Sequence, residues 1–272
     1  MSAPQPALPA EALSWEGRTP AEWQAAWDLP ELHIFEHVGS TNDVIRARAD
    51  AGAPAGTTAI AEIQTHGRGR RSRPWTAPAG QALLFSTLIR PATSSPAEFA
   101  GTIPLRVGMA VARAIEDVTG IAPRLKWPND VLARDGRKLA GILCESILSA
   151  STLSYTVVGI GINVLQVPDD FDDDIRAAAA SLAMLMRTAP DRARIAGACI
   201  RELRPIVGVP VTALNECEQD EYSRRDALAG MSISVDGKPA GTAHGVAATG
   251  GLNVFAANER RLIHSGTVRI VA

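Results

Sequence analysis

The chain has 272 residues, of which 46% are hydrophobic and 21% charged, and its formal net charge at pH 7 is -2. This length allows one large domain with its own core and a small second domain. The near-neutral charge argues against a general affinity for nucleic acid or anionic membranes. The three cysteines lack metal-ligand spacing, and the sequence contains neither a membrane-spanning apolar run nor a signal-peptide pattern. We therefore expect a globular protein of the cytoplasm.

The first 30 residues are rich in proline and alanine and carry three tryptophans at short spacing. Trp15, Trp23 and Trp27 are placed as on a short amphipathic segment, so we interpret this stretch as an arm that packs on the domain surface. Apolar and polar residues then alternate over residues 32–38, which predicts a strand.

A polar cluster follows this strand. Ser40, Thr41 and Asn42 open a predicted helix that continues to about residue 50, with Ser40 and Asp43 placed as a capping pair. Capping alone would explain these residue types. The alternative is a group of hydroxyls and an amide that faces a polar ligand.

One short stretch concentrates positive charge more than any other part of the chain: Gly67-Arg68-Gly69-Arg70-Arg71-Ser72-Arg73-Pro74-Trp75. It lies between strands predicted over residues 57–64 and 82–90, so it is a loop at a sheet edge, where binding sites tend to lie. Each guanidinium presents a planar fork that matches phosphate or carboxylate oxygens, and the glycines let the backbone approach a ligand closely. A solvated basic loop is the alternative, but this position favours an anionic ligand.

Residues 96–119 carry apolar side chains at helical spacing, which predicts a helix. The next notable stretch is Lys126-Trp127-Pro128-Asn129-Asp130. Asp135-Gly136 indicates a turn before a return strand that begins at Lys138, so we expect Lys126 and Lys138 on the two arms of one hairpin. Lysine is rare in this chain, and each of these two is a candidate for a position that needs a compact ammonium.

The predicted secondary structure of the second half of the chain changes from a strand to helices and then to short strands. A strand is predicted over residues 154–160, and two helices near 174–187 and 191–206. Beyond Tyr222 the chain consists of short apolar runs broken by glycine and asparagine, which favours a small β-barrel. We therefore divide the chain into an arm (residues 1–30), a large domain (31–220) and a small C-terminal domain (221–272).

Taken in order, these stretches resemble the catalytic region of biotin protein ligases over roughly residues 32–272. The stretches that carry the resemblance are Ser40-Thr41-Asn42, Gln64, Gly67 to Trp75, Lys126 to Asp130, Lys138 to Leu143 and Gly159 to Asn163. The resemblance implies an α+β fold, with a mixed sheet flanked by helices as in class II synthetases and an SH3-like C-terminal barrel. It implies a ligase that makes biotinyl-5′-AMP from biotin, ATP and Mg²⁺. Such a ligase passes biotin to one lysine of a biotin carboxyl carrier protein domain of an acyl-CoA carboxylase.

The resemblance also implies roles for single residues. The biotin-binding candidates are Ser40, Thr41, Asn42, Gln64, Gly67, Arg68, Gly69, Arg70, Lys126 and Gly141. The ATP-binding candidates are Arg68, Arg70, Arg73, Trp75, Lys126, Asn129 and Asn163. Lys126 and Arg70 are the catalytic candidates, because joining a carboxylate to the α-phosphate of ATP brings two anions together and needs fixed cations.

Several roles stay open at this level. Trp75 either stacks on adenine or anchors the loop by packing. Asn129 and Asp130 either orient Lys126 or bind Mg²⁺ through water, and Lys138 contacts phosphate or the carrier or is a surface charge. The sequence assigns neither metal ligands nor the base of the transfer step. We expect the loop to order over the bound intermediate and to shield it from water.

Other functions are weighed against this one. A lipoate or octanoate protein ligase shares the fold and is the main alternative. A biotin-dependent repressor would need a DNA-binding domain, which the roughly 30 residues before Leu32 cannot hold. A P-loop hydrolase would need Gly-Lys-Ser/Thr after the glycine-rich loop, and none follows. We therefore expect no nucleic-acid or membrane partner, and a monomer or homodimer.

Overall fold

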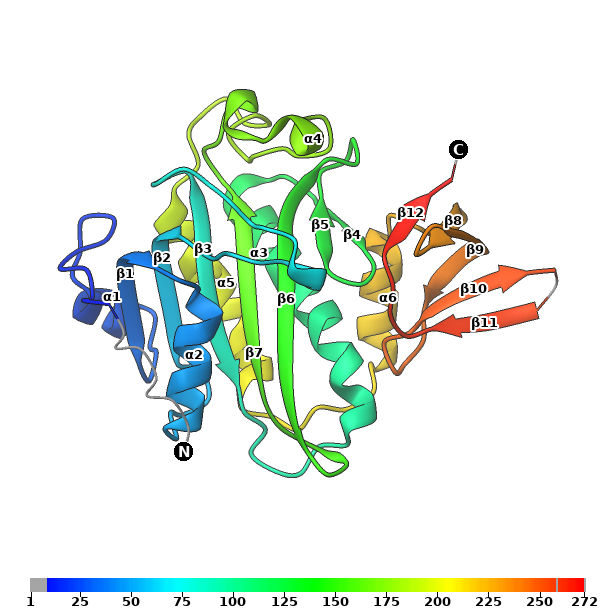
Figure 1. Ribbon diagram of the computed structural model, residues 1–272, viewed down its shortest axis with the longest axis horizontal. Coiled ribbons are helices and arrows are strands. Elements are labelled where there is room, and N and C mark those ends of the chain that lie inside the picture. The colour runs from blue at the N-terminus through cyan, green and yellow to red at the C-terminus, as the bar shows by residue number, and fades with distance from the viewer. Residues whose placement is uncertain (1–8, 258, 272) are drawn as a thin grey trace.

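The computed structural model describes residues 9–257 and 259–271 and is built on a seven-stranded sheet (Figure 1). The strand order is β1-β2-β3-β7-β6-β5-β4, with β1 and β2 parallel and the other neighbours antiparallel. The strands are β1 (Leu32–Val38), β2 (Thr58–Gln64), β3 (Ala82–Ile89), β4 (Arg124–Lys126), β5 (Asp130–Leu132), β6 (Lys138–Ser149) and β7 (Thr152–Asn163). The mixed sheet expected from the resemblance is confirmed.

Helices cover the two faces of this sheet unequally. On one face α3 (Ile103–Thr119) and α5 (Arg192–Val207) pack against each other and against the strands, and on the other face lies α2 (Thr41–Asp50) (Figure 1). Both faces of β3 are covered, so all eight of its residues are buried. Beyond α2, the face of β6 and β7 is crossed by the connection between β2 and β3, residues 65–81, which we name the Arg loop (Figure 1).

The N-terminal arm packs on the large domain as predicted, over residues 9–30; residues 1–8 lie outside the described part. Its helix α1 (Pro20–Ala26) begins with a capping box formed by Thr19 and Glu22. The rings of Trp23 and Trp27 stack with centroids 4.6 Å apart, and Trp15 lies edge-on to both. All three tryptophans are buried in the core shared with α3 and α5.

The C-terminal residues form a second sheet of five antiparallel strands in the order β11-β10-β9-β8-β12. Its strands are β8 (Ser232–Val235), β9 (Lys238–Val246), β10 (Leu252–Ala256), β11 (Glu259–Ile263) and β12 (Val268–Ile270). It is preceded by α6 (Glu216–Arg225), which the sequence does not predict, because this helix is mostly polar. The signal for α6 is local: Asn215 and Glu218 form a capping box. The small β domain itself agrees with the SH3-like expectation.

Two predictions about the large domain are wrong. The helix expected over residues 174–187 is reduced to one turn, α4 (Asp173–Arg176). The backbone after it is used elsewhere, since residues 178–183 exchange hydrogen bonds with Lys138 and with the end of β7. Lys126 and Lys138 do not lie on the two arms of one hairpin either, because the short strand β5 lies between β4 and β6 and pairs with both.

The start of α3 also differs from the prediction, because residues 97–102 form a 3₁₀ segment before the helix begins. Its end is as expected: Gly120 closes the helix in the left-handed region at φ +72. Among residues 9–257 and 259–271, no helix combines the length and apolar composition needed to cross a bilayer.

Candidate active site

Two glycines form a flat floor on the face of β6 and β7 that the Arg loop crosses. Gly141 and Gly161 are paired across the two strands, and the indole of Trp75 lies on both. A Cβ added at Gly161 would lie 2.5 Å from this ring, and one at Gly141 would lie 2.8 Å from it. Only glycine leaves room for the ring. The Nε1 of Trp75 lies on the Gly161 side of the ring and is buried without a hydrogen-bond partner in the described chain.

The Arg loop folds back on itself before it reaches this floor. The amide of Gly69 donates to the carbonyl of Arg73 at 2.8 Å, and the amide of Trp75 donates to that of Gly67 at 2.9 Å. A Cβ at Gly67 would lie 2.3 Å from the carbonyl oxygen of Trp75, so this position also requires glycine. At the tip, Ser72 adopts φ +56, a conformation that glycine or asparagine adopts with less strain.

A buried cluster of neutral polar groups lies beside the loop, at the start of α2. The backbone amide of Thr41 donates to Oε1 of Gln64 at 2.8 Å, and its Oγ1 lies 2.6 Å from Oγ of Ser86. Ser86 in turn donates to Oδ1 of Asn42 at 2.6 Å. The cluster presents hydroxyls and amides without net charge, and the biotin role that the resemblance implies for Thr41, Asn42 and Gln64 stays a prediction. Ser86, on β3, is a member that the sequence reasoning missed.

The predicted capping pair of Ser40 and Asp43 is wrong. Ser40 is buried at the N-cap of α2, but its side chain makes no capping hydrogen bond. The carboxylate of Asp43 instead receives both terminal nitrogens of Arg68, at 2.6 and 3.0 Å. This carboxylate is therefore engaged by the Arg loop and not by its own helix.

Arg68 is neutralised on the α2 side of the loop. Besides Asp43, its Nη2 donates to both oxygens of Glu145 at 3.2 Å, and Asn42 donates to the same carboxylate at 2.7 Å. The hydrogen bonds that Arg68 donates to Asp43 raise the pKa of Arg68 despite its partial burial, with Glu145 adding to the effect. Glu145 was missed at the sequence level, although a carboxylate in the buried register of a strand was a usable signal.

Arg70 and Lys126 have the opposite electrostatic setting. Burial is the largest cause that lowers the pKa of Arg70, and the neighbouring charge of Arg71 lowers it further. Burial likewise lowers the pKa of Lys126; Asp130 opposes this shift, while Lys138 and Arg269 add to it. Both cations feel the field of Asp130. The structure therefore gathers half-buried positive charge that its own carboxylates do not fully compensate.

Asn129 and Asp130 hold other residues of the site in place. Asn129 accepts from Nη1 of Arg70 at 3.4 Å and donates to the carbonyl of Ile142 at 2.9 Å. Asp130 pairs with Nζ of Lys138 at 2.6 Å. That ammonium lies 5.4 Å from the centre of the Trp75 ring, so it reaches the floor as well.

Two predicted ATP-binding residues lie differently from the rest. Arg73 is exposed, and it makes no side-chain hydrogen bond with any described residue. Asn163 is buried at the end of β7, where its Nδ2 donates to the carbonyls of Lys138 and Ala180 at 3.2 Å and its Oδ1 accepts from Gln166 at 3.1 Å. These bonds join β7 to the segment after α4. The adenine role of Asn163 and the phosphate role of Arg73 stay predictions.

The C-terminal domain contacts the Arg loop; the sequence left open whether this domain assists the ATP or carrier step or only packs on the large domain. Arg70 donates to the carbonyl of Gly266 at 3.2 Å. Arg71 pairs with Asp236 at 2.7 Å in the turn between β8 and β9. Arg269 on β12 contributes positive charge near Lys126. These contacts join segments far apart in sequence, and no local pattern marks them.

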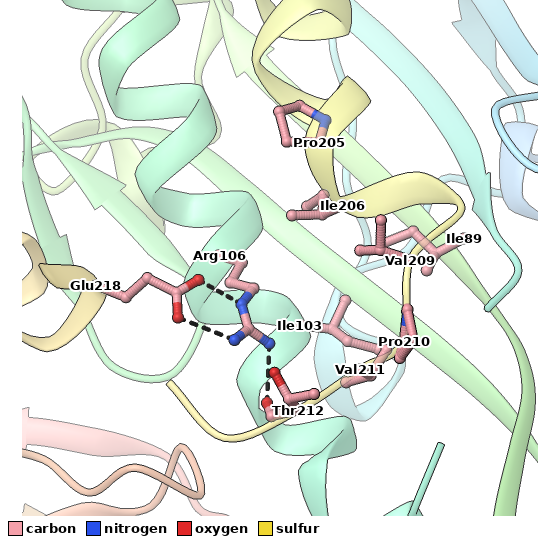
Figure 2. A pocket seen from close by; sticks show the side chains of 10 residues that line it. All are labelled: Ile89, Ile103, Arg106, Pro205, Ile206, Val209, Pro210, Val211, Thr212 and Glu218. Atoms are coloured by element: carbon pink, nitrogen blue, oxygen red, sulfur yellow. Dashed lines mark hydrogen bonds and ion pairs between the residues drawn. The ribbon is translucent and has the colours of Figure 1, made fainter. Parts of the chain in front are cut away.

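Two other cavities are lined by charged residues that already pair with each other. A cavity of about 220 Å³ lies between α3 and the end of α5 (Figure 2), where the charged lining residues Arg106 and Glu218 bind each other at 2.6 Å. A second, of about 430 Å³, includes the ion pair of Arg204 with Asp28 at 3.0 Å. Within the described ranges, no group of three or more His, Cys, Asp or Glu residues is arranged to hold a metal ion.

Comparisons with known proteins identify the family of the chain. The model of the biotin/lipoate A/B protein ligase family matches residues 35–163. A biotin–acetyl-CoA-carboxylase ligase of Mycobacterium tuberculosis is 42% identical over 210 residues, which cover 76% of this chain and 74% of that protein. The bifunctional ligase/repressor BirA of Bacillus subtilis is 36% identical over 165 residues, 60% of this chain but only 50% of the relative.

The solved structures give the same answer for the fold. The biotin protein ligase from Aquifex aeolicus in complex with biotin and ATP superposes with a TM-score of 0.71 at 27% identity, covering 89% of this chain and all of the other. The ligase from Leishmania major in complex with biotinyl-5-AMP has a TM-score of 0.56 at 25% identity, covering 89% and 99%. With the match to the mycobacterial ligase over three quarters of both proteins, these findings show that the chain belongs to the biotin protein ligases of the biotin/lipoate A/B protein ligase family.

Proposed function

We propose that this chain is an ATP-dependent biotin–acetyl-CoA-carboxylase ligase. It joins the carboxylate of biotin to the α-phosphate of ATP, releasing pyrophosphate. It then passes biotin from biotinyl-5′-AMP to a lysine amine of a biotin carboxyl carrier protein domain, releasing AMP. The observation that carries the proposal is the pair of half-buried cations, Arg70 and Lys126, which share Asp130 as a neighbour and whose pKa values are lowered by burial and by like charges.

The first half-reaction explains why such a pair is needed. Both reactants are anions, and charge builds up on the α-phosphorus and on the leaving pyrophosphate. Arg70 and Lys126 lie where burial weakens solvent screening, so they offset this charge more strongly than exposed cations would. A bound anion also relieves the repulsion from Arg71, Lys138 and Arg269. Binding energy and rate enhancement thus come from the same charges.

Different groups beside the two cations suit different parts of biotin and ATP. The neutral cluster of Thr41, Asn42, Gln64 and Ser86 suits the ureido ring of biotin, which is polar and uncharged. The Trp75 ring, with its buried Nε1, suits a planar base or the acyl chain above the floor. The Arg loop lies over this surface and keeps water from the acyl-adenylate, which water would hydrolyse.

Magnesium enters the proposal through ATP. Asn129 and Asp130 are the oxygen donors beside the cations of the site, and both already have a partner. Asn129 accepts from Arg70 at 3.4 Å, and Asp130 pairs with Lys138 at 2.6 Å. This donor set fits an ion that ATP phosphates carry into the site better than an ion held by protein side chains alone. When bound, Mg²⁺ would neutralise part of the pyrophosphate charge, while Asn129 and Asp130 keep Arg70 and Lys138 positioned.

The second half-reaction concerns the partner. The amine of the carrier lysine must lose a proton before it attacks the acyl carbon, and positive charge around Lys126 and Arg269 favours that loss. We propose a cytoplasmic enzyme that acts on the biotinyl domain of an acyl-CoA carboxylase, without nucleic acid or membrane, as a monomer or homodimer.

The decisive experiment follows the mass of a carrier. The purified chain is incubated with biotin, Mg-ATP and an apo biotinyl domain, beside Lys126→Ala and the matched control Lys238→Ala, which removes an exposed lysine on β9. We expect a biotin-sized mass gain with wild type and with Lys238→Ala. The gain should slow by roughly 100-fold or more with Lys126→Ala, the usual scale for losing one group that stabilises developing charge.

The other outcomes are equally informative. A mass gain with lipoate or octanoate but none with biotin would move the chain to the related ligases that share its fold. Release of pyrophosphate without any change in the carrier would leave the adenylation step standing and refute the proposed partner. An unchanged rate in Lys126→Ala would remove the central cation from the mechanism.

A further inference from the structure

The two strands that carry the Arg loop separate before the loop begins. β2 and β3 are paired only between residues 58–61 and 84–87. Glu62, Ile63 and Gln64 at the end of β2, and Ala82 and Leu83 at the start of β3, are not paired with each other. The base of the loop therefore lacks the backbone hydrogen bonds that fix the spacing of neighbouring strands.

One side chain fills this gap. Arg192, the first residue of α5, is only 8% exposed. Its Nη1 donates to Oε2 of Glu62 and to the carbonyl of Ala82, both at 3.1 Å, and its Nη2 donates to Oε1 of Glu62 at 2.8 Å. A single planar guanidinium thus binds both stems of the Arg loop, which a point charge could not do with this geometry.

The N-terminal arm holds Arg192 from the outside. Glu16 accepts from Nε of Arg192 at 2.7 Å, and the Trp15 ring lies 5.5 Å from its guanidinium carbon. The indole of Trp15 also donates to Glu62. Burial alone would lower the pKa of Arg192, but the hydrogen bonds that it donates to Glu62, together with the charge of Glu16, raise it. The guanidinium is therefore charged and fully coordinated.

We propose that Arg192 is a positioning residue for the ligase reaction and that the N-terminal arm exists to hold it there. By fixing the distance between the two stems, Arg192 keeps the closed form of the Arg loop populated, so that Trp75 stays on the glycine floor and Arg70 keeps its contacts with Asn129 and Gly266. This inference rests on the proposed function. It gives the arm a role in substrate affinity, although the arm contributes no residue to the cation pair or the neutral cluster.

The test compares two arginines of α5 that both bind the arm. Arg192→Lys keeps the charge but cannot reach both stems and Glu16 at once. The matched control is Arg204→Lys, because Arg204 binds Asp28 at 3.0 Å and the carbonyl of Trp27 at 2.9 Å without contacting either stem. Both variants loosen the arm, and only the first releases the loop. Four quantities are measured: Tm, the rate of trypsin cleavage within residues 68–73, KM and kcat.

With Arg192→Lys we expect cleavage within the loop to quicken and KM for biotin to rise, each by about tenfold, the scale of losing one charge-assisted hydrogen bond. The turnover number kcat should change less than threefold, since the reacting charges are intact. Arg204→Lys should leave the cleavage rate and KM within about twofold of wild type, even where its Tm falls equally.

Two outcomes would overturn the inference. Equal cleavage rates in the two variants would show that Arg192 only stabilises the fold, as would a fall in Tm without any change in KM. The cleavage assay needs no turnover, so it separates this inference from the proposed function. If the wild-type protein failed to biotinylate the carrier, but the two variants still differed in cleavage rate, the proposed function would be refuted. The inference that Arg192 holds the two stems of the Arg loop would stand.

Discussion

Two neighbouring positions of the Arg loop, Arg68 and Arg70, carry the same residue type in opposite settings. Arg68 binds the carboxylates of Asp43 and Glu145, and its pKa is raised. Arg70, two residues on, is half-buried, lies near the like charge of Arg71, and has its pKa lowered. A partnered arginine stabilises the fold, whereas a buried arginine without a full counter-charge stores the energy that an anion can release. The sequence shows four equivalent arginines; only the structure separates their roles.

The largest effect is expected when Arg70 and Arg68 are each replaced by a neutral residue. Arg70→Gln should weaken binding of a non-hydrolysable biotinyl-5′-AMP analogue by roughly 100-fold, the scale for losing one partner of a buried charge pair. Its stability should be unchanged or slightly higher, because an uncompensated charge is removed. Isothermal titration calorimetry and urea unfolding give the two numbers.

Arg68→Gln is the matched variant, and we expect it to lose stability while it keeps most of its affinity for the analogue. It leaves the carboxylates of Asp43 and Glu145 without their common cation, which should lower the free energy of unfolding by about 1–2 kcal/mol. Affinity for the analogue should fall less than tenfold. If both variants lost affinity equally and neither lost stability, the distinction between Arg68 and Arg70 would be wrong.

A smaller and pH-dependent effect is expected at Lys126. Its pKa is lowered in the free protein by burial and by Lys138 and Arg269, and a bound anion raises it again. Affinity should therefore be constant at low pH and fall by up to about tenfold per pH unit above the lowered pKa. This fall should begin below the ordinary lysine value of about 10.4.

Lys126→Arg provides the control for the pH profile. Arginine stays charged throughout this range, so its affinity should be lower at neutral pH, by a few-fold for the poorer fit, but flat as the pH rises. Stability has the opposite sign: the unfolded lysine binds its proton more tightly, so stability should rise with pH between the lowered and ordinary pKa values. An identical alkaline fall in both proteins would assign the titration to another group.

How far the sequence predicts the fold depends on how local the signal is. Strands β1, β2 and β3 and helix α5 begin and end within about two residues of their predicted bounds, because their apolar periodicity is strong. The region 174–187 fails, since its backbone is recruited by β6 and β7 instead of forming a helix. Hydrogen bonds to distant strands override helical propensity there.

The same limit applies to the site. The resemblance finds Gly67, Trp75 and Lys126, and Gly141 is found as well, although its role as floor for an indole is visible only in three dimensions. The partners that decide the charge state of the site come from elsewhere in the chain: Glu145 from β6, Arg269 from β12, and Arg192 with its arm. Pairings over such distances leave no periodic trace in one sequence.

The smallest effect tests a third arginine, Arg71, which is partnered but exposed. It binds Asp236 at 2.7 Å, while the amide of Thr267 and then Arg71 lower the pKa of that carboxylate. Asp236→Asn should quicken trypsin cleavage of the Arg loop by only about two- to threefold, because exposed ion pairs are weak. Asp135→Asn, in the other Asp-Gly turn and paired with Arg137 at 2.7 Å, should leave cleavage unchanged. A tenfold effect at Asp236 would mean that the C-terminal sheet holds the loop as firmly as Arg192 does, and closure would then be controlled from both ends.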